Sequence, residues 1–160
     1  MFNQIIAGIL SFLLWIFPWS GTLLSLYQSA SFPGESVVTK NIVDAINAGD
    51  IDAIEAMFSP DRKQTMDDLP GHIGALIDAI GGEVIEIRFN GAGYSSSESG
   101  TGRAYNYRSW ARYLDTETET YILDIGWMIT NSSAPREVGL GSLHLSDLQG
   151  NILAHTYYPK

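Results

Sequence analysis

The chain of 160 residues contains no cysteine. This absence excludes disulfide bonds, a thiolate nucleophile, cysteine-ligated zinc and the lipid-bearing cysteine of a lipoprotein. The sequence also lacks the glycine-rich signatures of nucleotide-binding loops, the serine signature of α/β-hydrolases and the paired-histidine signature of zinc proteases. We therefore expect no cofactor, and no motif identifies a reaction.

Charge is absent from the beginning of the chain, because the first charged side chain is that of Glu35. The stretch from Ile5 to Tyr27 (IIAGILSFLLWIFPWSGTLLSLY) has 23 uncharged residues. As a helix it would span roughly 34 Å, compared with about 30 Å for the hydrocarbon core of a bilayer. Trp15 and Trp19 lie toward its downstream end, where aromatic rings favour the membrane interface. The sequence thus predicts a transmembrane anchor within residues 1–28.

Two other interpretations of this stretch compete with the anchor. A cleaved signal peptide normally begins with basic residues, which are absent here, and Ser29-Ala30-Ser31 offers only a poor cleavage site. A helix buried in a globular core is disfavoured by Pro18 and by the unbroken apolar surface. We favour a single-pass anchor at the cell membrane with an extracytoplasmic domain. The protein would be secreted if the segment were cleaved.

Basic residues are scarce, with 9 Lys and Arg against 18 Asp and Glu, for a net charge of −9. This balance argues against unaided binding to nucleic acid or to anionic lipid headgroups. Residues 29–35 (SASFPGE) have the composition of a linker. Residues 36–160 are enough for one domain with its own core.

The first half of this domain has the apolar period of helices. Ser36 and Asp50 are predicted N-caps, and the predicted stops are Gly49 and the pairs Ser59-Pro60 and Gly81-Gly82. The stretch that follows Ser59-Pro60 is polar, before a third helix. The predicted helices cover residues 36–48, 51–58 and 69–80.

From Glu83 the period changes to two. Ile85, Ile87 and Phe89 alternate with charged residues, which predicts a half-buried strand. The segment at 91–100, with the overlapping 95–102 (SSSESGTG), is predicted to be a loop. Further strands are expected at about 104–114, 120–130, 138–146 and 152–158. The pattern predicts an α+β fold, in which three helices pack on a curved antiparallel sheet of four or five strands.

Several segments resemble a known superfamily. The opening KNIVDAINAGDIDAIEAMFSP (residues 40–60) is similar to the entry of the nuclear transport factor 2-like (cystatin-like) cone. The segments DLPGHIGALIDAIGG (68–82) and EVGLGSLHLSD (137–147) resemble a subgroup of uncharacterised bacterial exported proteins, often lipoproteins. The resemblance implies a cone with an apolar pocket at its open end, used for catalysis, ligand binding or dimerisation. The chain departs from the subgroup in lacking the lipoprotein cysteine.

Asp124 is the carboxylate of most interest. It lies in an apolar strand on the face opposite Leu123 and Ile125. If that face lined a pocket, burial would raise the pKa of Asp124 and suit it to act as a general base. The clean alternation favours the other interpretation, in which this face is exposed to solvent.

Aromatic residues on the strands are the candidate ligand-binding residues. Tyr105, Tyr107 and Tyr113 share one face of the strand at 104–114, and Trp110 lies on the other. Together with Trp127 they could line a pocket. The alternative, which we favour, is that the tyrosines cover a core or a dimer interface.

The histidines give a weak signal, and no metal site is expected. His72 is interpreted as a partly exposed helix residue. His144 and His155 flank the turn at 147–151 and would face each other if the loop were Gln149-Gly150 alone. A three-residue loop with Gly150 as a bulge would instead place His144 against Ala154.

These observations favour a membrane-anchored extracytoplasmic domain that binds a small apolar ligand or a protein, or forms a homodimer through its sheet. The alternative is a lyase, isomerase or hydrolase with Asp124 or His144 as the base and Tyr113 orienting the substrate. The side to which Asp124 points distinguishes the two hypotheses.

Overall fold

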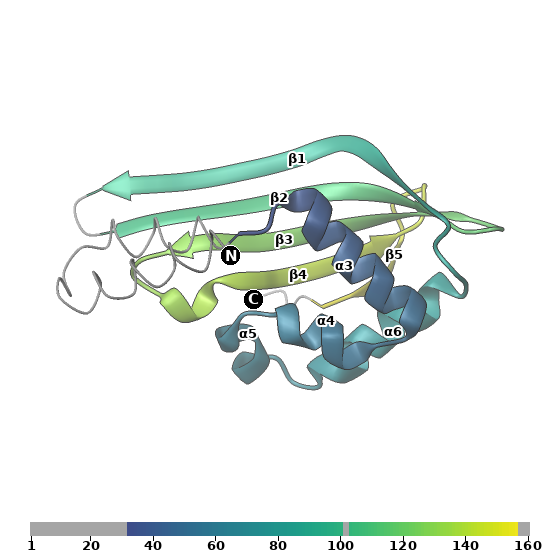
Figure 1. The fold of residues 1–160 in the computed structure, drawn as a ribbon, viewed down its shortest axis with the longest axis horizontal. Coiled ribbons are helices and arrows are strands. Elements are labelled where there is room, and N and C mark those ends of the chain that lie inside the picture. The colour runs from purple at the N-terminus through teal and green to yellow at the C-terminus, as the bar shows by residue number, and fades with distance from the viewer. Residues whose placement is uncertain (1–31, 101–102, 157–160) are drawn as a thin grey trace, which may run out of the picture.

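A computed structural model describes residues 32–100 and 103–156. Within these residues the helices precede the strands, as the sequence predicts (Figure 1). The helices are α3 (Glu35–Ala48), α4 (Ile51–Met57), α5 (Pro60–Thr65) and α6 (Leu69–Ile80). The strands are β1 (Glu86–Gly100), β2 (Arg103–Asp115), β3 (Thr120–Asn131), β4 (Gly139–Ser146) and β5 (Ile152–His155), with a short 3-10 helix η1 (Pro135–Glu137) before β4.

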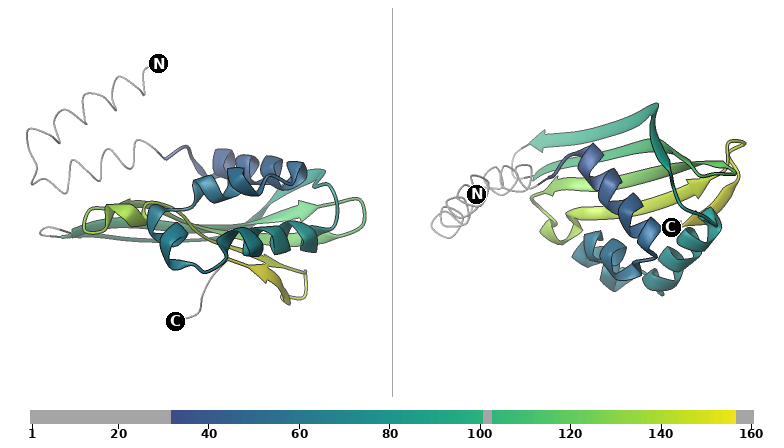
Figure 2. Two further views of the ribbon diagram at one scale, coloured as in Figure 1. Left: turned by 90° about the horizontal axis from the view of Figure 1, so that it is seen from below. Right: turned by 45° about the vertical axis from the view of Figure 1, so that its right-hand side comes forward.

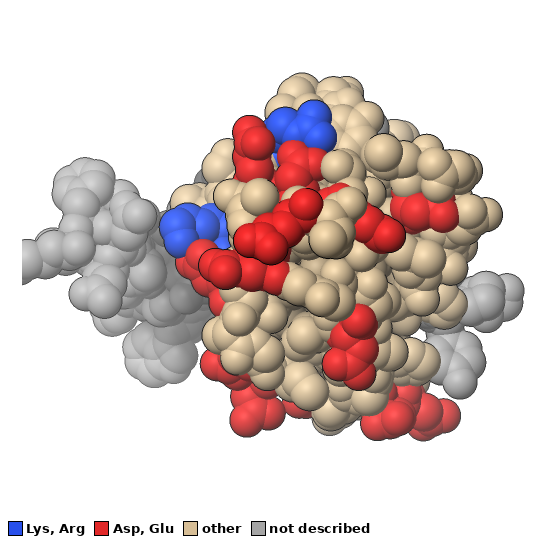
Figure 3. Space-filling model, turned by 90° about the vertical axis from the view of Figure 1, so that its right-hand side faces the viewer, with Lys and Arg blue, Asp and Glu red and all other residues tan. Residues whose placement is uncertain are grey.

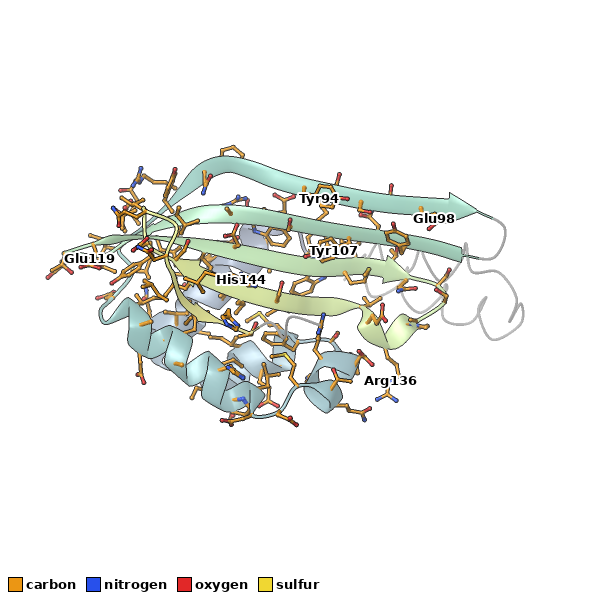
Figure 4. The ribbon with its side chains drawn as sticks, turned by 180° about the vertical axis from the view of Figure 1, so that it is seen from behind. Tyr94, Glu98, Tyr107, Glu119, Arg136 and His144 are labelled. Carbon is orange, nitrogen blue, oxygen red and sulfur yellow. The ribbon has the colours of Figure 1, made fainter. Side chains whose placement is uncertain are left out.

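The strands form one antiparallel sheet in the order β1-β2-β3-β4-β5, which confirms the predicted meander. Helix α3 crosses one face of this sheet, whereas α4, α5 and α6 gather along its β4–β5 side (Figures 1 and 2). No described helix covers the opposite face, which is seen in Figure 4. Strand β1 forms the edge farthest from α4–α6 (Figure 1).

The helix boundaries follow local sequence signals, with one correction. Gly49 ends α3 in the left-handed conformation, at φ 65°, and Asp50 caps α4 by accepting a hydrogen bond from the Ala53 N–H at 2.9 Å. The predicted cap at Ser36 is wrong. Helix α3 already begins at Glu35, after Gly34, so the predicted linker ends one residue earlier.

The polar stretch after Ser59 is a further helix that the sequence prediction missed. The Ser59 side chain accepts a hydrogen bond from the Arg62 N–H at 3.3 Å, and Pro60 occupies the first turn of α5. Proline has no backbone N–H, but in the first turn this costs no helical hydrogen bond, because the first N–H groups of a helix are unpaired in any case. The Ser-Pro pair therefore both stops α4 and starts α5.

Strand β1 is longer than predicted. Ser95–Gly100, expected to be a loop, pair with β2, for example Ser96 with Tyr107, after an irregularity between Phe89 and Gly93. Small polar residues have low strand propensity, but the long strand β2 supplies partners for their backbone groups. Tertiary pairing thus overrides local composition.

The core lies between α3, α6 and the covered face of the sheet. Two polar side chains join these layers: Trp110 Nε1 donates to Thr39 Oγ1 at 3.0 Å, and the Tyr121 hydroxyl donates to the Ile80 carbonyl at 3.1 Å. Both bonds satisfy groups that would otherwise be buried without a partner. The largest fully buried side chains include Ile42, Ile54, Phe58, Ile73, Leu76, Leu114, Leu123, Ile125, Leu140, Leu143 and Leu145.

The predicted anchor from Ile5 to Tyr27 lies outside the described residues. In the described part of the chain, none of the helices has the length and apolar character needed to cross a bilayer.

Candidate ligand-binding groove

The start of β1 and the residue just before it, Ile85, carry apolar side chains that are exposed in the described structure. Ile87 pairs with Leu114, and Phe89 with Arg112, which places both on the face that α3 crosses. Yet Ile85 is 61% exposed, Ile87 38% and Phe89 72%. The predicted strand is confirmed, but the predicted burial of its apolar face is wrong, because α3 crosses the inner strands of the sheet and leaves the edge strand β1 open (Figure 1). Neighbouring exposed apolar side chains of this kind commonly mark a binding surface.

A hollow of about 460 Å³ lies between these side chains and α3. We call it the α3–β1 groove. Its volume falls in the range typical of small-molecule sites. The groove is lined by Ser36, Thr39, Lys40, Val43, Asp44, Asn47, Val84, Ile85, Glu86, Ile87, Phe89 and Arg112.

Two further hollows extend the groove toward the N-terminal end of α3. A hollow of about 340 Å³ shares Phe89 with the groove and continues past Glu35 and Arg108. Another, of about 600 Å³, lies between residues 32–37 and the side chains of Asn106, Arg108 and Ile129. The three hollows together follow α3 along the open edge of the sheet.

Two arginines share one carboxylate at this end of the groove. Glu35 accepts from Arg108 Nη1 at 3.2 Å and from Arg112 Nη2 at 3.4 Å. Arg112 also donates to the Ala111 carbonyl at 2.8 Å, and its guanidinium lies 5.0 Å from the centre of the Phe89 ring. The end of the molecule at the right of Figure 1, away from the start of α3, is by contrast mostly acidic (Figure 3).

The structure divides the predicted ligand-binding residues between the two faces of the sheet. Tyr107 lies on the uncovered face (Figure 4), and the strand alternation places Tyr105 and Tyr113 there as well. Trp110 is 2% exposed in the core, and Trp127 packs against Phe32 with ring centres 5.9 Å apart. Because successive side chains of a strand point to opposite faces, the five residues cannot line one pocket.

Asp124 also lies away from the groove. It pairs with His144 across β3 and β4, is exposed and lines none of the three hollows. Partial desolvation raises the pKa of Asp124, and the nearby His144 opposes this shift. The position matches the interpretation that this face of the strand is open to solvent.

The three histidines lie next to one another. His144 faces His155 in the hairpin register, and their ring centres are 5.9 Å apart; His72 of α6 stacks on His155 at 6.5 Å. The turn contains Gly150 at φ 83°, as the three-residue loop requires, but a register shift between Leu145 and Ser146 restores the direct pairing of the histidines. Among the described residues, no group of three or more His, Asp and Glu side chains is arranged to hold a metal.

The histidine cluster predicts a pH dependence of stability. Desolvation lowers the pKa of His144 below its ordinary value of 6.5; His155 lowers it further, and Asp124 opposes the shift. The unfolded chain therefore binds more protons than the folded one as the pH falls below about 6.5, so this contribution to stability is complete above that pH and is lost below it. We expect the urea midpoint to fall between pH 7.5 and 5.5, and to fall less in His144→Gln. An equal fall in both proteins would contradict the assignment.

Sequence reasoning missed the residues that form the groove. One signal was available: Arg112 lies between Trp110 and Leu114 on one face of β2, and an unpaired arginine beside two buried apolar side chains would be costly to bury. Its partner Glu35 is 77 positions away in the chain, so no local pattern connects the two.

Residues 41–150 match the family described as a domain of unknown function (DUF5104). The chain belongs to this family. The matched region of DUF5104 runs from α3 to the turn between β4 and β5, and it contains Arg108, Arg112 and the apolar row of β1. The stretch from Ile5 to Tyr27 and the Glu35 carboxylate lie outside it. No curated protein matches the chain.

Proposed function

We propose that this domain is a binding domain whose α3–β1 groove takes a small apolar ligand. The observation that supports the proposal is the row Ile85, Ile87 and Phe89, which stays exposed beside a hollow of about 460 Å³. A ligand lying on this row would remove its apolar surface from water, a change worth roughly 25 cal/mol per Å² before the costs of binding.

Binding of linear alcohols tests the groove. The full chain in phospholipid nanodiscs is titrated calorimetrically with 1-hexanol and 1-octanol, and the signal of empty nanodiscs is subtracted. We expect 1-octanol to bind roughly tenfold or more tightly than 1-hexanol, because each buried methylene contributes about 0.8 kcal/mol. Phe89→Ser should weaken octanol binding by about tenfold, because it removes a ring that the ligand would cover.

Ile152→Ser is the matched control for this experiment. Ile152 is 62% exposed, almost the same as Ile85, but it lies on β5 at the other edge of the sheet. The control should bind octanol like the unchanged protein. Equal losses in Phe89→Ser and Ile152→Ser, or equal binding by all three proteins, would refute the groove as the site.

We infer further that the domain is a nuclear transport factor 2-like cone. The order of four helices followed by an antiparallel meander, and the position of α3 across one face of the sheet, support this inference. The resemblance implies an apolar pocket in the cone, and the α3–β1 groove, between a helix and the sheet, is the candidate for it.

We also propose that the stretch from Ile5 to Tyr27 anchors the domain on the outer side of the cell membrane. Its length and lack of charge support the proposal. After carbonate extraction of cells, we expect the full-length chain to stay in the membrane pellet. A soluble mature form that begins near Ser31 would show instead that the segment is cleaved and the protein secreted.

Two other roles have less support. The uncovered face of the sheet, with Tyr105, Tyr107 and Tyr113, would be the surface of a homodimer. The pairing of Asp124 with His144 is the observation that favours an enzyme, a lyase, isomerase or hydrolase with one of them as the base. Both side chains lie outside the three hollows, whereas the groove combines a hollow with exposed apolar residues.

A further inference from the structure

The floor of the α3–β1 groove contains a buried cation with unused hydrogen-bond donors. The Arg112 side chain is 9% exposed and lines the groove. A guanidinium carries five N–H donors. Arg112 uses one on the Ala111 carbonyl and one on Glu35, and the other three have no partner among the described residues. Buried charges are normally paired and fully hydrogen-bonded, so this site has capacity for another acceptor.

The carboxylate that now holds Arg112 is shared and loosely bound. Glu35 contacts Arg112 at 3.4 Å, which is longer than the 2.7–2.9 Å usual for a charge-assisted hydrogen bond. It also contacts Arg108 at 3.2 Å, and its side chain is 31% exposed. One negative charge therefore serves two positive charges at this end of the groove.

The other charged groups along the groove are engaged elsewhere. Lys40 and Asp44 form an ion pair with each other on α3. Glu86 interacts electrostatically with Arg88, which itself pairs with Asp115. The positive charge left over is that of the Arg108–Arg112 pair. In a chain of net charge −9, this is the place in the groove where an anion would be stabilised.

The apolar row begins at the same point. The Phe89 ring lies 5.0 Å from the Arg112 guanidinium, and Ile87 and Ile85 follow at intervals of two residues. Residues two apart on a strand are separated by about 6.6 Å, so the row is roughly 13 Å long from Phe89 to Ile85. A cationic end that continues into a linear apolar wall matches a linear molecule with one anionic end.

Accepting the groove as the ligand site, we propose that its ligand is a single-chain amphiphile with a carboxylate head. The carboxylate binds Arg112 and Arg108 in place of Glu35, and the hydrocarbon tail lies on Phe89, Ile87 and Ile85. A carboxylate is the expected head because the two guanidinium groups already hold one, that of Glu35, between them. Glu35 is thus an internal competitor of the ligand.

The test compares octanoate with 1-octanol in the full chain in nanodiscs, with empty nanodiscs as the blank. The two probes share the tail and differ in the charge of the head. We expect octanoate to bind about tenfold more tightly than octanol, because a hydrogen bond to a charged group is worth about 1.5–3 kcal/mol. Equal affinities would overturn the carboxylate head and leave the apolar groove standing. Binding of neither probe would refute both proposals.

Substitutions of the charged residues test where the carboxylate head of the ligand binds. Glu35→Gln should strengthen octanoate binding severalfold and leave octanol unchanged, because it removes the competing charge. Arg112→Gln should abolish the preference for octanoate. Because Arg112 is buried, that variant could fail to fold, so Arg108→Gln, whose native side chain is 46% exposed, provides the second test and should reduce the preference. A preference that none of these changes alters would overturn the assignment to the arginines, and tighter binding of octyl phosphate would overturn the choice of a carboxylate.

Discussion

We expect Trp110→Ala to lower the free energy of unfolding by about 3–5 kcal/mol, the range for truncation of a large buried aromatic side chain. Trp110 is 2% exposed and lies in the core under α3. Its Nε1 donates to Thr39 Oγ1, which in turn donates to the Glu35 carbonyl at 2.8 Å. The substitution therefore leaves a cavity and removes the side chain that fixes the first turns of α3 to the sheet. Chemical denaturation measures the change.

Two comparisons separate these effects. Trp110→Phe keeps most of the volume and removes the hydrogen bond, so it should cost far less than Trp110→Ala, about 1 kcal/mol; the difference between the two variants is the cost of the larger cavity. Trp127→Ala removes a half-buried ring and should cost less than Trp110→Ala. A loss below about 1 kcal/mol for Trp110→Ala would contradict the position of this side chain in the core. Since Glu35 lies at the same end of α3, a loosened α3 would also weaken ligand binding in the groove.

Gly139→Ala has the second largest expected effect, a loss of roughly 2–4 kcal/mol. Gly139 begins β4 at φ 132°, a region that essentially only glycine adopts. An added Cβ would lie 3.1 Å from the Met57 carbonyl oxygen and 3.1 Å from the Ser59 backbone nitrogen. These are backbone atoms, and the Ser59 N–H is bonded to the Leu140 carbonyl at 3.0 Å, so they cannot yield without breaking the contact between α4–α5 and β4.

Two further glycine substitutions are the controls for Gly139→Ala. Gly150 has φ 83°, and Gly82 has no positive φ; at both positions an added Cβ meets nothing within 4 Å. Gly82→Ala should be nearly neutral, and Gly150→Ala should show the backbone strain alone, about 1–2 kcal/mol. Thermal or urea unfolding of the three variants measures the order of their losses of stability. If Gly139→Ala were as well tolerated as Gly82→Ala, the close approach at the start of β4 would be wrong.

The candidate site illustrates why alternation is not enough to locate a binding surface. The sequence correctly indicates that Tyr107 and Trp110 lie on opposite faces of β2, because the side-chain period of a strand is two. It does not indicate which face α3 covers, or how far that cover extends. Ile125 and Ile87 have the same strand-like surroundings in the sequence, yet one is fully buried and the other is 38% exposed.

The length of β1 has a related explanation. Residues 95–100 have the composition of a loop, and local propensity predicts one. Their backbone groups nevertheless pair with β2, which is long enough to offer partners along its whole length. A local window of the sequence carries no information about pairing with a remote segment, so the predicted loop was wrong.

What the sequence determined by itself is local: the α+β order, the meander, the ends of α3 and α6 at Gly49 and Gly81, and the alternation of each strand. These features depend on backbone conformation and side-chain period over a few residues. Only the tertiary structure decided that α3 leaves the edge strand open, and that Glu35 reaches Arg112 across 77 positions to form a charged end of the groove. Burial and ion pairing between distant segments depend on how the layers are placed, and that placement is a property of the whole fold.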